Sequence, residues 1–97
     1  MELSKIKSYI GFAIKSRNIK FGVEEILKLK HSTLILVSKA LAESSLVKVQ
    51  NFALNRNCEI LLFEADNFSE LFSGNQSVKA VAVVDDNLAI AIKKYYD

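Results

Sequence analysis

The sequence predicts an α/β fold, a three-layer α/β/α sandwich built on a four-stranded mixed sheet. Three short runs, at residues 34–37, 60–63 and 80–84, are apolar at every position, which is typical of strands buried on both faces. Segments with apolar residues at helical spacing alternate with these runs, and such alternation favours layered α/β folds. The 97 residues contain no proline and only three glycines, so we expect one domain, residues 1–97, with short connections.

The first third of the chain is predicted to form two helices with a short strand between them. A helix is expected over residues 4–16, with Ser4 as its N-cap. Its apolar face consists of Leu3, Ile6, Ile10, Ala13 and Ile14. A short strand follows over residues 18–21, and Gly22 then begins a second helix that ends near residue 30. The side chains that this helix turns inward are expected to be Val23, Ile26 and Leu27.

The rest of the chain is predicted to alternate strand and helix three times. In order, we expect a strand over 33–38, a helix over 41–56, a strand over 58–63, a helix over 67–73, a strand over 78–84 and a helix from residue 86. Gly74 is expected to end the fourth helix of the chain. Asp85 and Asp86 lie where the last helix begins, so we interpret them as capping residues rather than as a catalytic pair.

The composition excludes several functional classes. With one cysteine, Cys58, and one histidine, His31, the chain has no internal disulfide and is not expected to hold zinc. No apolar run approaches the roughly 20 residues that span a bilayer, and the first residues lack the apolar stretch of a signal peptide. No glycine-rich phosphate loop or nucleophile motif is present. We therefore expect a cytoplasmic protein that is not an enzyme and uses no cofactor, metal or membrane.

Positive charge is concentrated at the N-terminal end of the sequence. Residues 1–31 carry seven basic and three acidic side chains, whereas residues 32–97 carry six basic and eight acidic ones. A basic first third indicates an anionic partner, although a solvated helix face would account for the same charges.

The segment around Gly22 contains the most informative pattern. Glu24, Glu25 and Lys28 are expected to project outward from the first two turns of the second helix. Gly22 leaves the start of that helix uncovered beside Lys20, so its free N–H groups face outward, as they do in anion-binding sites. An ordinary surface pair between Glu24 and Lys28, four residues apart, would explain these charges without a ligand. That pair does not explain why Lys20, Gly22 and the basic first helix are expected to converge on the start of the second helix.

Residues 22–28, Gly-Val-Glu-Glu-Ile-Leu-Lys, resemble the Gly-x-Asn-Glu-x-Thr-Lys signature of the kink-turn RNA-binding ribosomal protein family, the L-seven-Ae/L-thirty-e superfamily. Residues 11–17, 34–40 and 78–89 are similar to its first helix end, its second strand and its last strand with the closing helix. The resemblance covers nearly the whole chain. It is strongest to the bacterial YlxQ-type branch, in which Gly-Glu-Glu is found at this helix start.

The resemblance implies an α/β/α sandwich that binds sharply bent RNA, with the start of the second helix in the major groove at sheared G·A pairs. Glu25 matches the family's Glu and would accept hydrogen bonds from guanine N–H groups. Lys28 matches the family's Lys and would donate to guanine O6 or N7. Lys20 would contact phosphate, and Gly22 would let the RNA backbone approach.

The sequence departs from the family's pattern at three places. Glu24 stands where the family has Asn, and an ionised carboxylate cannot donate a hydrogen bond and repels phosphate. Leu27 replaces a Thr, which removes a hydroxyl. The loop over residues 75–79 is more polar than the family's loop, so Ser77 and Lys79 are expected to touch phosphate. We therefore expect RNA binding that is weaker, or tuned to another RNA, than in strong kink-turn binders.

The expected partner is structured RNA, either ribosomal or of the kink-turn type. Ribosomal proteins are possible further partners, and we expect the chain to act as a monomer. A protein-interaction module on the same fold is the alternative, because a fold does not fix a function. In that case a basic partner would dock on the acidic residues of the C-terminal part, Glu64, Asp66, Glu70, Asp85 and Asp86.

Overall fold

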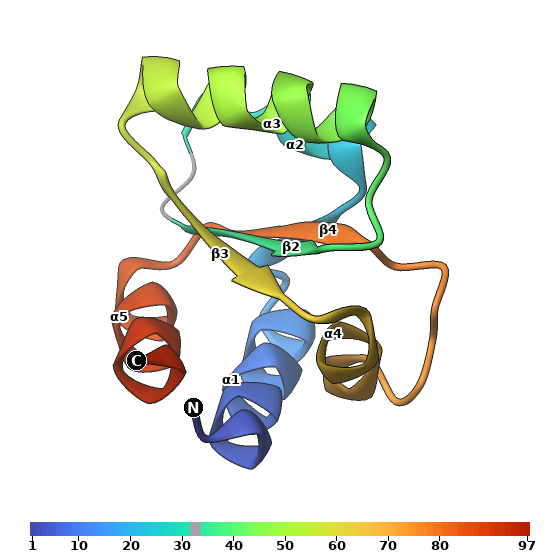
Figure 1. Ribbon diagram of the computed structural model, residues 1–97. Helices are drawn as coiled ribbons and strands as arrows, with labels where there is room; N and C mark the ends of the chain where they lie inside the picture. The colour runs from blue at the N-terminus through green and yellow to red at the C-terminus, as the bar shows by residue number, and fades with distance from the viewer. Residues whose placement is uncertain (32–33) are drawn as a thin grey trace.

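The computed structural model describes residues 1–31 and 34–97, in which five helices surround a four-stranded sheet (Figure 1). The elements follow in the order α1 (Leu3–Lys15), β1 (Ile19–Phe21), α2 (Val23–Leu27), β2 (Leu34–Ser38), α3 (Glu43–Arg56), β3 (Glu59–Phe63), α4 (Ala65–Leu71), β4 (Ala80–Val83) and α5 (Asp86–Tyr96). The predicted order of helices and strands is therefore confirmed. Residue 33, expected to begin the second strand, lies outside the described residues.

The sheet is mixed, as predicted, and its strands lie in the order β1-β4-β2-β3. β2 and β3 are parallel, whereas β4 runs antiparallel to both of its neighbours, β1 and β2. Phe21, the last residue of β1, pairs with Val81 of β4. β1 is thus a short strand at the edge of the sheet, and its end lies beside the start of β4.

Helices cover both faces of the sheet, which makes the fold a three-layer α/β/α sandwich. α2 and α3 lie on one face, and α1, α4 and α5 lie on the other (Figure 1). In β2, Leu34 and Leu36 join the apolar core under α1, α4 and α5, while Ile35 and Val37 join the core under α2 and α3. All four side chains are fully buried. The uninterrupted apolar run of this strand therefore arises because each face of the sheet has its own core.

Several helix ends differ from the expectation: α3 begins at Glu43 instead of residue 41, and α4 spans Ala65–Leu71 instead of residues 67–73. Ser4 lies inside α1 rather than at its N-cap, because the helix begins at Leu3 and the N-cap position is Glu2, whose side chain makes no capping hydrogen bond. α2 ends at Leu27 instead of near residue 30. Its last turn tightens, since the N–H of Lys28 donates to the carbonyl oxygen of Glu25, three residues earlier, at 3.3 Å.

Two apolar side chains expected in the core are partly open to solvent. Leu27 is 37% exposed and Ile14 is 46% exposed. Ile14 lies on the last turn of α1, which packs against β1 at the edge of the sheet, where no further strand covers it. The helical periodicity was therefore a correct guide to Ile6, Ile10 and Ala13, which are fully buried, but not to Ile14.

The boundary at Asp85 follows the prediction, whereas α4 ends at Leu71, with Phe72 as its C-cap, and Gly74 lies in the turn that follows. Gly74 has a φ of +82°, a left-handed conformation that favours glycine, and its N–H donates to the carbonyl oxygen of Ser69 at 2.8 Å. Asp85 caps α5 by accepting a hydrogen bond from the N–H of Leu88 at 2.9 Å. Within the described ranges, no helix has both the length and the apolar character needed to cross a membrane.

Candidate nucleic-acid interface

The candidate site is organised by the bend between β1 and α2, at Gly22. The N–H of Gly22 donates to the carbonyl oxygen of Ala80 at 2.9 Å, which extends the β1–β4 pairing by one residue. Gly22 then turns the chain into α2 with φ +91° and ψ 152°, a combination that residues with a Cβ rarely adopt. Gly22 is exposed, and a Cβ built on it would meet nothing within 4 Å. The backbone at this bend is therefore open to a large ligand.

The loop between α4 and β4 ends beside this bend. Lys79 directly precedes Ala80, and its carbonyl oxygen accepts a hydrogen bond from the N–H of Ser38 at 2.9 Å. These backbone bonds fix Lys79 next to the start of α2, although 57 positions separate Lys79 from Gly22 in the numbering. The side chain of Lys79 is exposed and lines a hollow with Ala65, Asp66 and Ser69 of α4. The structure thus brings together two segments that lie far apart in the sequence.

Ser77 has a different environment from Lys79. Its backbone N–H and its hydroxyl both donate to the Oδ1 atom of Asn75, at 3.0 and 2.6 Å. Ser77 is exposed, but its hydroxyl is already engaged within its own loop. A role in holding Asn75 is therefore better supported by the structure than a direct contact with phosphate.

The outward side chains of α2 are held on a well-anchored helix. Ile26 is fully buried and Val23 is half-buried against α3, so Glu24, Glu25 and Lys28 face solvent. The alternative surface pair between Glu24 and Lys28 does not form, because Lys28 Nζ lies 3.2 Å from the Oε2 atom of Glu25 instead. The tightened last turn of α2 explains this, since it brings residues three apart over one another.

The pair between Lys28 and Glu25 is readily exchanged for a ligand. The two side chains are 74% and 56% exposed, and ion pairs in water contribute at most about 1 kcal/mol. α2 has only five residues, so its helix dipole is short and the lysine side chains must supply most of the attraction for an anion.

A hollow of about 470 Å³ lies at the start of α2, and its lining includes Gly22, Glu24 and Glu25. The far wall of the hollow is formed by Ser45 and Lys48 of α3. Neither residue could be predicted as part of the site, because nothing local in residues 43–56 indicates that α3 packs against α2. The exposed lysine on the first half of α3 was the only available signal.

The strand β1 contributes Lys20 to the same side of the sheet. Side chains alternate along a strand, and Ile19 joins the core under α1, α4 and α5. Lys20 therefore points to the face that carries α2 and α3, where it is exposed. Lys20, Lys28 and Lys48 thus come from β1, the end of α2 and α3, whereas Lys79 precedes β4 and lines a separate hollow with Ala65, Asp66 and Ser69 of α4.

The acidic residues considered for protein docking are largely engaged in the fold. Lys39 Nζ donates to Glu64 Oε1 at 2.6 Å, and this hydrogen bond raises the pKa of Lys39 above its ordinary value. Glu70 lies 3.6 Å from Lys7, and Asp85 caps α5. Within residues 1–31 and 34–97, no three His, Cys, Asp or Glu side chains are grouped so as to hold a metal ion.

Known proteins match this chain in their structures but not in their sequences. No family model matches the chain, and no curated protein matches it. A protein of unknown function from Bacillus halodurans superposes with a TM-score of 0.82 at 15% identity, over 96% of this chain and 97% of that one. The Giardia lamblia 15.5kD RNA binding protein superposes with a TM-score of 0.71 at 12% identity, over 99% of this chain and 86% of that one. The chain shares its whole fold with these two proteins.

Proposed function

We propose that this protein binds bent, structured RNA of the kink-turn type through the surface around the start of α2. The observation that carries the proposal is the hydrogen bond between Gly22 and Ala80, which fixes Lys79 beside α2. The basic surface then runs from Lys48 of α3, which lines the hollow at this bend, to Lys79, which lines the neighbouring hollow beside α4. A concentration of exposed lysines on one folded surface is what neutralising phosphates requires. The shared fold with the Giardia RNA binding protein supports the same class of partner.

Each side chain at this surface has a role that its chemistry allows. Glu25 accepts hydrogen bonds from guanine N–H groups, and Lys28 donates to guanine O6 or N7 once RNA has displaced their mutual pair. Lys20, Lys48 and Lys79 contact phosphates. Gly22 has no side chain, which lets the RNA backbone approach.

Glu24 weakens the fit to an ordinary kink-turn. It is exposed beside Glu25 on the first turn of α2, and a second carboxylate there adds repulsion towards phosphate without supplying a donor. We infer that the cognate RNA presents a donor at this position, or that affinity is lower than the fold alone permits.

The RNA partner that we propose is ribosomal or ribosome-associated, in a cytoplasmic protein that performs no catalysis. A docking module for basic proteins is the second candidate. Of its acidic residues, Asp85 caps α5, whereas Glu64 and Glu70 would have to exchange their exposed pairs with Lys39 and Lys7.

Calorimetric titration with a kink-turn RNA tests the proposal. The control RNA has the same length, with the sheared G·A pairs replaced by Watson–Crick pairs. We expect wild-type protein to prefer the kink-turn and Lys79→Ala to bind it less tightly. Lys94→Ala, which removes an exposed lysine from α5 on the opposite face of the sheet, is expected to bind as wild type. Equal binding of both RNAs, or no binding at low salt, would overturn the proposal.

A further inference from the structure

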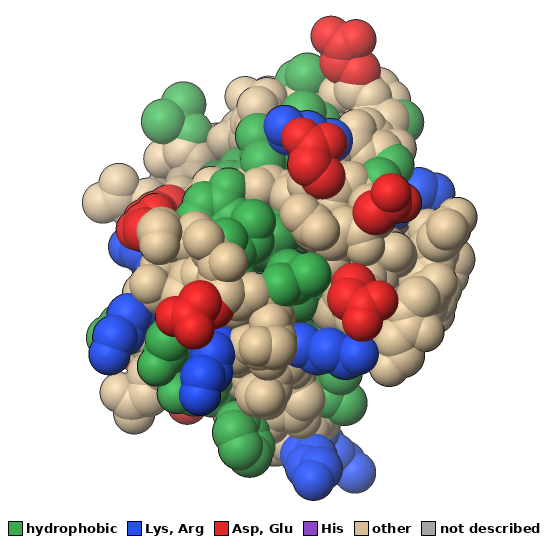
Figure 2. All heavy atoms as spheres, turned by 60° about the horizontal axis from the view of Figure 1, so that its bottom comes forward, with side chains coloured by type: hydrophobic (Ala, Val, Ile, Leu, Met, Phe, Trp, Pro, Cys, Tyr) green, Lys and Arg blue, Asp and Glu red, His purple; other side chains and the backbone are tan. Residues whose placement is uncertain are grey.

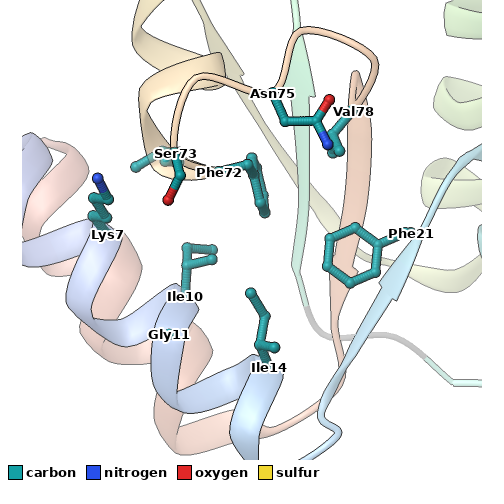
Figure 3. Close-up of a pocket in the computed structure, with 10 residues that line it drawn as sticks. Lys7, Ile10, Gly11, Ile14, Phe21, Phe72, Ser73, Asn75 and Val78 are labelled. Carbon is teal, nitrogen blue, oxygen red and sulfur yellow. The ribbon is translucent and has the colours of Figure 1, made fainter.

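A second hollow, of about 310 Å³, lies on the other face of the sheet, between α1, β1 and the chain that follows α4 (Figure 3). Its apolar wall includes Ile10, Ile14, Phe21, Leu71, Phe72 and Val78, together with the backbone of Gly11. The rings of Phe21 and Phe72 meet edge to face, with their centroids 5.8 Å apart and their planes at 71°. Phe21 is 41% exposed, so an aromatic ring is left open to solvent at the mouth of the hollow. We call this hollow the aromatic cavity.

Gly11 keeps the aromatic cavity open. A glycine inside a helix destabilises it by roughly 0.5–1 kcal/mol relative to alanine. Packing does not require a glycine here, because a Cβ at residue 11 would meet nothing within 4 Å. Lys7 and Lys15 lie one helical turn before and after Gly11, on the same side of α1. The cavity is therefore bordered by the bare backbone of Gly11 and by Lys7, with Lys15 one helical turn beyond Gly11.

Asn75 adds a hydrogen-bond donor to the rim. Its Oδ1 atom accepts the two hydrogen bonds from Ser77, which fixes the orientation of the amide. The Nδ2 atom consequently lies on the side of the cavity (Figure 3). None of the described residues provides an acceptor for it. A planar ligand with an acceptor on its edge would accept a hydrogen bond from Asn75 Nδ2.

The face around the aromatic cavity is mixed in character. On the side formed by α1, α4 and α5, hydrophobic side chains reach the surface between lysine, arginine and acidic side chains (Figure 2). Lys7 is paired with Glu70 at 3.6 Å, but both side chains are well exposed and the pair exchanges readily. A ligand that joins an anionic group to a flat apolar group is complementary to this mixture of apolar and basic side chains.

We propose that the aromatic cavity takes one unstacked nucleotide from a single-stranded segment of the bound RNA. The base packs against Phe21 and Phe72, and an acceptor on its edge receives a hydrogen bond from Asn75 Nδ2. Lys7 and Lys15 contact the flanking phosphates. Stacking of unpaired bases on aromatic side chains is a general mode of RNA recognition. Phe21 directly precedes Gly22 and lines both hollows, so an RNA at the α2 surface reaches the cavity around the edge of the sheet. The inference rests on the proposed function and adds a single-stranded element to its RNA.

Substitutions at Gly11 separate this inference from the proposed function. Gly11→Leu fills the mouth of the aromatic cavity, whereas Gly11→Ala adds one methyl group and leaves most of it open. Neither touches the α2 surface, so both are expected to bind a kink-turn without extensions as wild type does. The probe is that RNA with four unpaired uridines added at the 5′ or the 3′ end.

We expect an extension at one end to tighten binding to wild type and to Gly11→Ala by at least about fivefold, the low end for stacking one base on an aromatic ring. The gain should vanish in Gly11→Leu. An equal gain in Gly11→Leu, or no gain at either end, would overturn the inference while leaving the proposed function intact. No gain is also the result if the cavity instead receives a side chain of a partner protein.

Nuclear magnetic resonance decides the inference even if the structured RNA fails to bind. Single-stranded tetrauridine is expected to shift the amide signal of Gly11 and the ring signals of Phe21 and Phe72, and to leave Gly11→Leu unaffected. Free uridine monophosphate, which lacks neighbouring phosphates, is expected to shift them much less at the same concentration. Absent shifts with tetrauridine would overturn the inference, and so would free nucleotide that binds as well as the oligonucleotide.

Discussion

The backbone N–H of Gly22 donates to the carbonyl oxygen of Ala80 across 2.9 Å, and this bond joins the two halves of the candidate site. It holds the bend before α2 against the first residue of β4. Lys79, one residue before Ala80, is fixed in place by the same pairing. The position of each lysine around the bend therefore depends on backbone geometry that only glycine adopts easily at residue 22.

Gly22→Ala is expected to lower the free energy of unfolding by roughly 1–3 kcal/mol, because φ +91° with ψ 152° strains any residue that has a Cβ. RNA affinity should fall as well, since the strained bend displaces α2 from Lys79. Urea unfolding and RNA titration measure the two effects. Gly11→Ala is the matched control. Gly11→Ala is expected to raise the free energy of unfolding by about 0.5–1 kcal/mol. A lower free energy of unfolding in this variant would contradict the argument from glycine conformation.

Single lysine-to-alanine substitutions at Lys28 and Lys79 are expected to weaken RNA binding without changing stability. Both side chains are exposed, so neither contributes to a core. Removing a phosphate contact at Lys79 should reduce the slope of log K against log salt by about 1. Lys28→Ala should cost about 1–3 kcal/mol on the cognate RNA, because it removes a base contact. Salt-dependent titrations distinguish the phosphate contact of Lys79 from the base contact of Lys28. An unchanged RNA affinity in Lys28→Ala would mean that the binding site lies elsewhere.

Glu24→Asn is expected to tighten binding to a kink-turn RNA by about 1–3 kcal/mol, because the amide supplies a donor where the carboxylate has none. Glu24→Gln removes the same charge but places the amide one methylene further out. A gain confined to Glu24→Asn indicates a base contact. Equal gains in both variants would indicate that only the negative charge matters.

Asp85→Ala is expected to lower the free energy of unfolding by about 1 kcal/mol, through loss of the cap on α5. Asp86, the next residue, makes no such bond among the described residues, so Asp86→Ala should have a smaller effect. Urea unfolding measures both. RNA affinity is expected to stay unchanged in each variant, and a large change would indicate that these carboxylates form a binding surface.

The order of elements could be predicted because it depends on local patterns. Two of the three runs that are apolar at every position became strands with a core on each face, as the alternation of Leu34 and Ile35 between the two cores illustrates. The prediction of burial on both faces is wrong for the run at residues 60–63, because β3 lies at the edge of the sheet and leaves Leu62 40% exposed. The sheet order β1-β4-β2-β3 was not predicted, since it depends on pairings between distant residues. The exact helix ends were missed at Ser4 and Leu27, because one turn gained or lost there changes the free energy little.

The candidate site could be predicted only where its residues lie close together in the sequence. Gly22 begins the second helix as expected, and Glu24, Glu25 and Lys28 face outward. Lys48 could not be found, because it reaches the site only through the packing of α2 against α3. Ile14 was expected in the core, and it lines the aromatic cavity instead, because the edge strand β1 leaves that end of α1 uncovered.

Chemical-shift mapping with an unextended kink-turn RNA tests the central claim most directly. The amide signals that move on binding are expected to lie in residues 20–28, around Lys48 and in residues 75–80, with the largest shifts next to Gly22. The shifts should saturate and should weaken as salt is raised. Shifts confined to α5 and β3, or none at low salt, would contradict the account.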